Sequence, residues 1–154
     1  MIVDIARLPP DGERFVGEEP GSCLGLDGEE DIRIDSPVQY DLTARMVSGK
    51  LLVTGSARAR VSLACSRCGT AFETTVSEPR LDRLFESVNK NESLDLTPEI
   101  REAIILAFPN HPVCRADCRG LCPRCGANLN QGPCRCAPPP TEGRWSALGG
   151  LNLK

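Results

Sequence analysis

Apolar and polar residues alternate through the middle of the chain, and this pattern predicts β-strands. Between residues 38 and 46, one face is shared by Val38, Tyr40, Leu42, Ala44 and Met46. The same period of two returns over residues 51–65 and again over residues 71–76. Such alternation puts one face of a strand against a core and the other toward water. The chain therefore predicts an antiparallel meander with one face covered.

Turn and loop residues separate these strands. Ser48-Gly49-Lys50 predicts a tight turn, because glycine tolerates positive φ. Residues 80–85, RLDRLF, predict a further strand. Residues 1–36 are rich in glycine, proline and acidic residues, and they predict a short strand at 2–5 and a loop at 17–31. Cys23 in that loop is interpreted as an ordinary free thiol.

Residues 97–108 change to the period of a helix. Thr97 is expected to be the N-cap, Pro98 suits the first helical position, and Pro109 ends the helix because the residue before proline avoids the helical region. The apolar stripe consists of Ile100, Ala103, Ile104, Ala107 and Phe108. This stripe predicts a helix packed on the sheet as part of the core.

These elements predict an α+β fold: an antiparallel β meander or partly open barrel with one packed helix and a Cys-rich metal-binding segment. Three regions are expected. Residues 1–110 form the sheet domain with its acidic N-terminal segment and packed helix, 111–137 a Cys-rich zinc-binding segment, and 138–154 a Pro-rich linker and C-terminal tail.

Six of the nine cysteines lie close together near the C-terminus: Cys114, Cys118, Cys122, Cys125, Cys134 and Cys136. Cys122-Pro-Arg-Cys125-Gly has the form of a zinc knuckle, in which two intervening residues aim both thiolates at one ion. A closed zinc site needs four ligands, so four or more of the six are expected to bind metal. The second pair could be Cys134 and Cys136 or the upstream pair, and six thiolates could also hold two ions with shared ligands. Structural zinc is favoured over an iron–sulfur cluster.

Two other cysteine patterns leave more than one interpretation open. Cys65-Ser-Arg-Cys68-Gly joins two predicted strands, so its thiols could complete a metal site, form a redox pair or only form a turn. A redox motif normally opens a helix, and none is predicted here, which argues against the redox interpretation. Cys118, Cys122 and Cys125 match the spacing of radical S-adenosylmethionine enzymes, but the chain has no series of βα units, so the match is attributed to chance.

Charge is distributed unevenly along the chain, although the net charge is only −3. Residues 1–47 carry eleven acidic and four basic residues, whereas residues 111–154 carry six basic and two acidic residues. A candidate surface for RNA or a partner consists of Arg58, Arg60 and Arg67, supported by Arg115, Arg119, Arg124 and Arg135. Arginine suits phosphate because its planar guanidinium donates two parallel hydrogen bonds. Ordinary solvated positions would explain the same residues equally well.

Several function classes find no support in the sequence. No signal peptide and no membrane-spanning segment are visible, so a cytoplasmic protein with reduced thiols is expected. The single histidine, His111, is interpreted as a loop residue, and no nucleophile–base pair or phosphate-binding Gly loop is present. We therefore expect a protein that is not an enzyme and binds no small-molecule substrate.

Four stretches resemble the YceD family, also called the large ribosomal RNA subunit accumulation protein family. They are LACSRCGTAF, LDLTPEIREAIILAFPNHPVC, CRADCRGLCPRCGANLNQGPCRC and RWSALGGL. The resemblance covers about residues 38–151, and VDIARLP near the start is also similar to the family. Some members lack the Cys-rich insert, so the resemblance implies that the family's shared function does not depend on it.

The resemblance implies a non-enzymatic factor needed for large-subunit (23S) rRNA accumulation, with rRNA or a large-subunit ribosomal protein as partner. In the tail, Trp145 and Leu148 are candidate contact residues, because Trp145, Leu148 and Leu151 share a face if that segment is helical. Two alternatives are a zinc-stabilised protein-interaction module outside ribosome assembly and a Cys-x-x-Cys thiol oxidoreductase.

Overall fold

The computed structural model describes residues 1–86, 88–89 and 92–136. Its strands are β1 (Ile2–Asp4), β2 (Glu13–Glu19), β3 (Ile32–Ile34), β4 (Val38–Val47), β5 (Lys50–Ala64), β6 (Ala71–Phe85) and β7 (Ser93–Asp95). The helix α1 spans Thr97–Leu106, and two short 3₁₀ turns span Ile5–Arg7 and Gly21–Leu24. None of the described helices is long and apolar enough to cross a membrane.

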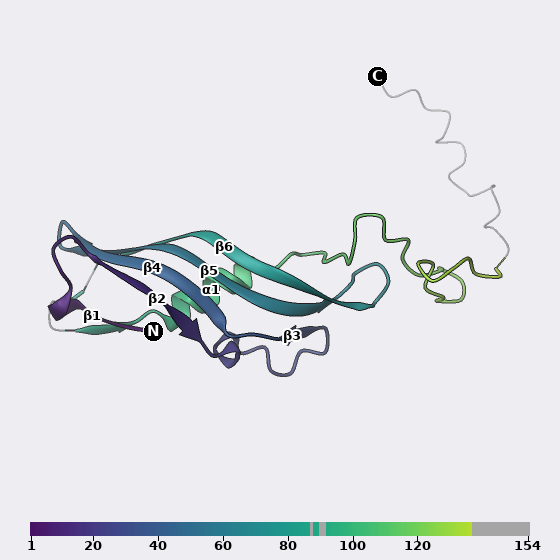
Figure 1. Cartoon of the computed structure of the whole chain (residues 1–154), viewed down its shortest axis with the longest axis horizontal. Coiled ribbons are helices and arrows are strands. Elements are labelled where there is room, and N and C mark those ends of the chain that lie inside the picture. Colours follow the sequence, from purple (N-terminus) through teal and green to yellow (C-terminus); the bar gives the residue numbers. More distant parts are fainter. Residues whose placement is uncertain (87, 90–91, 137–154) are drawn as a thin grey trace, which may run out of the picture.

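An open antiparallel sheet dominates the molecule, and β5 lies at its centre (Figure 1). β6 pairs with β5 along one edge, from Leu51–Phe85 to Ala64–Ala71. The other edge of β5 is shared, because β4 pairs with its first part and β3 with its last part. β2 extends the sheet beyond β4, and β1 pairs with β7 in a separate ribbon. The predicted α+β class and the meander β4–β5–β6 are confirmed, and the described strands form no closed barrel.

Two strands lie where the sequence predicted loop or little structure. β2 includes residues 17–19 of the predicted loop, and it pairs with β4 so that Phe15 faces Leu42. β3 is only three residues long and pairs Ile32 with Leu63 of β5. Neither segment has a long alternating pattern of its own. Both become strands because a neighbouring strand offers free backbone partners.

β6 is one continuous strand, whereas the sequence predicted two separate strands. Its register shifts against β5 between the pairs Ala57–Glu78 and Gly55–Leu81, which leaves one extra residue in β6. This bulge moves the core-facing positions from even to odd numbers, so that Val76 and Leu81 are both buried. Pro79 lies within the bulge, where its missing N–H breaks no ladder hydrogen bond.

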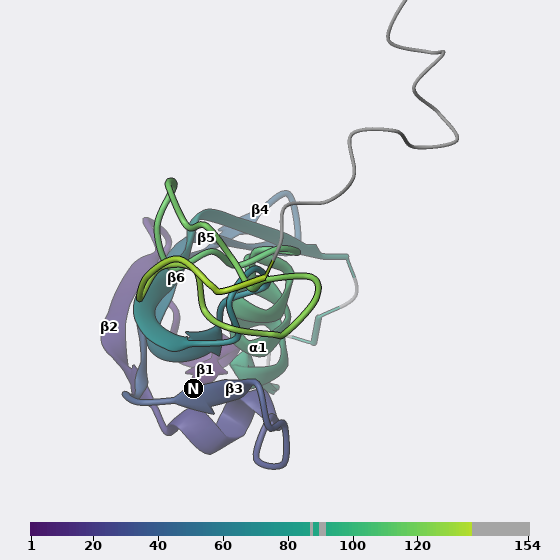
Figure 2. The same cartoon turned by 90° about the vertical axis from the view of Figure 1, so that its right-hand side faces the viewer.

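The core lies between the inner face of the sheet and α1, as the end-on view in Figure 2 shows. Ile100, Ala103 and Ile104 of the predicted stripe are buried, while Ala107 and Phe108 pack against the core less completely. The helix boundary differs slightly from the prediction. Thr97 is the first helical residue rather than the cap, and its backbone N–H and its hydroxyl both donate to Asp95 Oδ1, at 2.9 Å and 2.7 Å.

Candidate metal centres

Eight of the nine cysteines gather into two groups of four that could each hold a metal ion. The first group is Cys65, Cys68, Cys114 and Cys118, and the second is Cys122, Cys125, Cys134 and Cys136. Within each group the sulfur atoms all lie within 4.8 Å of one another. Tetrahedral coordination with bonds of about 2.3 Å would place zinc-bound sulfurs about 3.8 Å apart, so the groups need little adjustment to bind an ion. We call them centre 1 and centre 2.

Centre 1 joins two parts of the chain that are far apart in sequence. Cys65 and Cys68 lie at the tip of the β5–β6 hairpin, and Cys114 and Cys118 lie in the segment that follows α1. The Cys65 and Cys118 sulfurs are 3.9 Å apart, as are those of Cys68 and Cys114. Centre 1 therefore ties the tip of the sheet to the Cys-rich segment.

Centre 2 lies entirely within the Cys-rich segment. The Cys122 and Cys134 sulfurs are 3.4 Å apart. Cys122 is buried, whereas Cys125 is exposed, so this centre lies closer to the surface than centre 1. The radical-enzyme spacing has no structural counterpart, because Cys118 belongs to centre 1 while Cys122 and Cys125 belong to centre 2.

The two Cys-x-Arg-Cys-Gly turns have the same backbone hydrogen bonds. In centre 1, Gly69 N–H donates to Cys65 O and Cys65 N–H donates to Thr70 O. In centre 2, Gly126 N–H donates to Cys122 O and Cys122 N–H donates to Ala127 O. Both glycines have positive φ, +68° and +71°, a conformation that glycine adopts without a Cβ clash. CSRCG is therefore a knuckle of the same kind as CPRCG, and not the start of a helix, as a redox motif would require.

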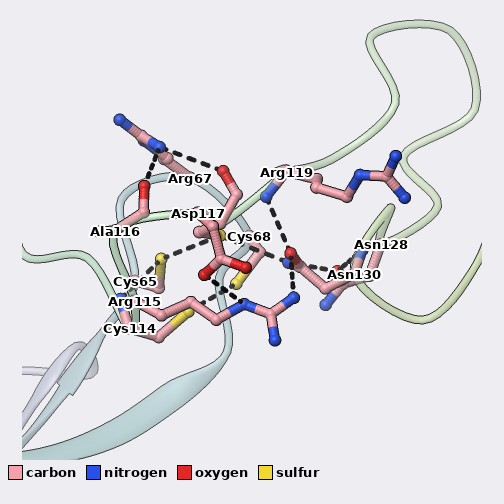
Figure 3. Close-up of polar contacts among 11 residues, drawn as sticks. Cys65, Arg67, Cys68, Cys114, Arg115, Ala116, Asp117, Arg119, Asn128 and Asn130 are labelled. Carbon is pink, nitrogen blue, oxygen red and sulfur yellow. Dashed lines mark hydrogen bonds and ion pairs between the residues drawn. The ribbon is translucent and has the colours of Figure 1, made fainter.

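Asn130 connects the loop of centre 2 to centre 1 (Figure 3). Its side-chain N–H donates to Cys118 Sγ at 3.3 Å, and its Oδ1 accepts from Arg119 N–H at 2.8 Å and from the Arg115 guanidinium at 3.0 Å. Asn128 supports it, because Asn128 Oδ1 accepts from both nitrogens of Asn130. Such contacts fix a ligand's orientation and stabilise the charge on its sulfur. Neither asparagine is predicted from the sequence, because the stretch GANLNQGP carries no signal that would identify them.

Hydrogen bonds prepare each centre to bind a cation. The Cys114 backbone N–H approaches Cys65 Sγ at 3.4 Å and is the largest of the contributions that lower the pKa of Cys65 to about 6. In centre 2, the backbone N–H groups of Cys125 and Arg124 lower the pKa of Cys122 to about 6. Each centre thus contains a thiolate at neutral pH.

Two other thiols hold their protons more firmly. Burial is the main reason that the pKa of Cys114 rises to about 12, and the hydrogen bond with Cys125 raises the pKa of Cys136 to about 12. A metal ion must displace these protons when it binds. Metal affinity is therefore expected to fall as the pH is lowered, with the steepest loss when the pH passes below about 6, where Cys65 and Cys122 also become protonated.

The arginines predicted as a contact surface have different surroundings. Arg58 and Arg60 are exposed on β5, and Arg58 Nε donates to Gln39 Oε1 at 2.9 Å. Arg67 is also exposed but supports centre 1, because its guanidinium donates to Cys118 O at 3.1 Å and Ala116 O at 3.4 Å (Figure 3). His111 is exposed in the loop after α1. Trp145 and Leu148 lie outside the described residues.

Replacing Asn130 by alanine is expected to weaken metal binding at centre 1 by about tenfold or more, because the Cys118 thiolate loses its side-chain donor. A chelator competition with each variant measures this affinity. Gln131→Ala is the matched control, since Gln131 is exposed and its side chain makes no hydrogen bond among the described residues. Equal affinities in the two variants would contradict the role given to Asn130.

Comparison with known proteins identifies the family. The family model described as large ribosomal RNA subunit accumulation protein YceD matches residues 77–152. An uncharacterized protein of Mycobacterium tuberculosis strain H37Rv is 33% identical over 163 residues, which cover 86% of this chain and 72% of the relative. The chain belongs to the YceD family. The matched range of the YceD model includes α1, all of centre 2 and two ligands of centre 1.

A plant relative carries the family name. The Arabidopsis thaliana protein called large ribosomal RNA subunit accumulation protein YCED homolog 1, chloroplastic, is 25% identical over 190 residues, which cover 96% of this chain and 58% of the relative. A Zea mays protein of the same name is 41% identical over 64 residues, or 40% of this chain and 21% of the relative. No solved structure matches the chain. The YceD family is thus described by accumulation of large-subunit rRNA and not by an enzymatic reaction.

Proposed function

We propose that this protein is a non-enzymatic, cytoplasmic ribosome biogenesis factor, needed for the accumulation of large-subunit (23S) rRNA, which it binds directly. Its membership of the YceD family carries this proposal, because the family is described by large-subunit rRNA accumulation. A large-subunit ribosomal protein is the alternative partner.

The proposed contact surface includes the outward face of β5. Arg58 and Arg60 are two residues apart on one strand, so their side chains project from the same face. Both are exposed, and Arg67 lies further along at the hairpin tip. Guanidinium groups at this spacing can contact successive phosphates of an RNA strand. Trp145 and Leu148 complete the proposed set from the tail.

We propose that both centres bind zinc in a structural role. The ligands would be the six cysteines of the Cys-rich segment together with Cys65 and Cys68. Four thiolates with no other ligand form the closed donor set typical of structural zinc, which leaves no open position for a substrate or water. Simple iron–sulfur sites also use thiolates. The two knuckle turns, each closed by a glycine with positive φ, favour a single ion over a cluster, since this turn suits two sulfurs that share one small ion.

Depletion of the protein in its host is expected to lower large-subunit rRNA relative to small-subunit rRNA. Wild-type protein should restore the ratio, and the variant Arg58→Glu/Arg60→Glu should not, because two positive charges on the proposed RNA surface become negative. Quantitative rRNA analysis and subunit profiles measure the effect. Arg7→Glu/Arg45→Glu is the matched control, as both arginines are exposed at other positions.

Unchanged rRNA levels after depletion would refute the proposed function. Restoration by Arg58→Glu/Arg60→Glu would refute only the assignment of the surface. The partner can be distinguished by pull-down of the protein with and without nuclease. A ribosomal protein that is still recovered after nuclease treatment would replace rRNA as the direct partner.

A further inference from the structure

An apolar cavity lies between the sheet, the end of α1 and centre 1. Its volume is about 470 Å³, within the range of pockets that bind a large side chain or a small ligand. Its apolar lining consists of Leu26, Ile32, Leu63, Ala64, Ile105, Phe108, Pro109 and Pro112. The knuckle of centre 1 supplies Cys65, Ser66 and Gly69 on another side. The cavity thus has three walls from distant parts of the sequence, and the knuckle that forms one of them belongs to centre 1.

The rim of this cavity includes one carboxylate, Asp31, which comes from the acidic loop before β3. Asp27, Glu29 and Glu30 precede it in the same exposed loop. None of these four carboxylates forms an ion pair among residues 1–86, 88–89 and 92–136. The site therefore suits an apolar group that lies next to a positive charge.

Such a group is present in this chain's own C-terminal segment. Eighteen residues follow Cys136, and they include the only tryptophan of the protein. Trp145 is preceded directly by Arg144 and is followed by Leu148 and Leu151. An aromatic anchor with an adjacent arginine matches both the apolar walls and the carboxylate of Asp31 at the rim.

The segment also has a long reach. Trp145 is the ninth residue after Cys136, and an extended chain of that length spans about 30 Å. Its starting point, Cys136, belongs to centre 2, and the loop of centre 2 is bound to Cys118 by Asn130. Cys118 in turn lies 3.9 Å, sulfur to sulfur, from Cys65, which lines the cavity.

We propose that this cavity binds Trp145 and the neighbouring apolar residues of the same chain, with Arg144 next to Asp31 at the rim. The proposal concerns the free protein and does not depend on rRNA binding. A partner that contacts Trp145 or Leu148 must first displace the segment from the cavity. Since Cys65, Ser66 and Gly69 form one wall, loss of metal from centre 1 is expected to open the site.

Fluorescence of Trp145 tests the proposal, because no other tryptophan contributes. In the metal-loaded full chain, we expect emission at shorter wavelength and several-fold weaker quenching by acrylamide than in a peptide of residues 137–154. Ile105→Asp should abolish this protection by placing a charge in the cavity wall. Leu106→Asp is the matched control on the same helix, since Leu106 is 71% exposed and does not line the cavity.

A second pair of variants changes only the tail, so it leaves residues 1–136 unaltered. Arg144→Glu should increase quenching, whereas Lys154→Glu should not. Trp145 that is quenched in the wild-type chain as strongly as in the peptide would overturn the proposal. Protection that disappears on dilution, together with a dimeric mass by light scattering, would also overturn it, because the occupant would then be the tail of a second copy. Protection of Trp145 that arises only when a ribosomal protein or rRNA is added would overturn the proposal as well.

Discussion

Replacement of Cys65 and Cys68 together by serine is expected to reduce bound zinc from two equivalents to one. It should also lower the free energy of unfolding by about 4 kcal/mol, because an intact structural ion contributes much of its binding energy to folding. Centre 1 is the connection between the hairpin tip and the segment after α1, and both its hairpin cysteines are buried. Elemental analysis and denaturant unfolding of the purified full chain measure the two effects.

Two other variants show whether the loss is specific to centre 1. Cys23→Ser removes a cysteine that belongs to neither centre, and it should keep both zinc equivalents. Cys134→Ser/Cys136→Ser should lose the ion of centre 2 while the sheet unfolds at nearly the wild-type denaturant concentration, since centre 2 contains no residue of the sheet. Retention of two equivalents by the Cys65→Ser/Cys68→Ser variant would refute the assignment of centre 1. Less than about half an equivalent in the wild-type protein would refute zinc binding altogether.

Replacement of Gly55 by alanine is expected to destabilise the protein by about 3 kcal/mol. A Cβ at this position would lie 2.1 Å from Asp41 O and 2.8 Å from Leu42 Cα, both of which are backbone atoms of the adjacent strand β4. Gly55 also has a φ of +154°, which other residues rarely adopt. Either β4 must move away from β5 or the bulge in β6 next to Leu81 must change. Urea unfolding with a fixed m-value measures the loss.

Gly28→Ala is the control for this substitution. A Cβ at Gly28 would have no other atom within 4 Å, and the φ of Gly28 is not in the left-handed range, so the substitution should be nearly neutral or slightly stabilising. If Gly55→Ala were equally neutral, the two strands would have to be able to separate locally at little cost. That result would contradict the close approach of β4 and β5 at this point.

The sheet and the helix could be predicted because the residue pattern that determines each of them lies within a short stretch of the sequence. Alternation over ten or more residues identifies a half-buried strand, and the stripe from Ile100 to Phe108 identifies the packed helix. β2 and β3 could not be predicted in the same way, because pairing with β4 and β5 determines them. The bulge in β6 explains why residues 71–85 look like two strands: each half keeps its own alternation, and only the parity changes.

The candidate metal centres could likewise be predicted only in part. Spacing identified the knuckle at Cys122 and Cys125 and left the origin of its second pair open. The choice depends on where the β5–β6 hairpin tip lies in space, because the tip brings Cys65 and Cys68 to the upstream pair, Cys114 and Cys118. The predicted regional division at residue 110 stays a prediction, although centre 1 draws ligands from both sides of it.

The long sequence separation within centre 1 has a consequence for synthesis. Cys65 and Cys118 are 53 residues apart, so the hairpin thiols leave the ribosome well before their partners. At about 5–20 residues per second, the delay lasts roughly 3–10 s. During that time an ion can be held by two sulfurs only, and the pair can be oxidised to a disulfide. The ion proposed for centre 1 can therefore be bound by all four sulfurs only after Cys118 has been translated, and the hairpin thiols must stay reduced until then.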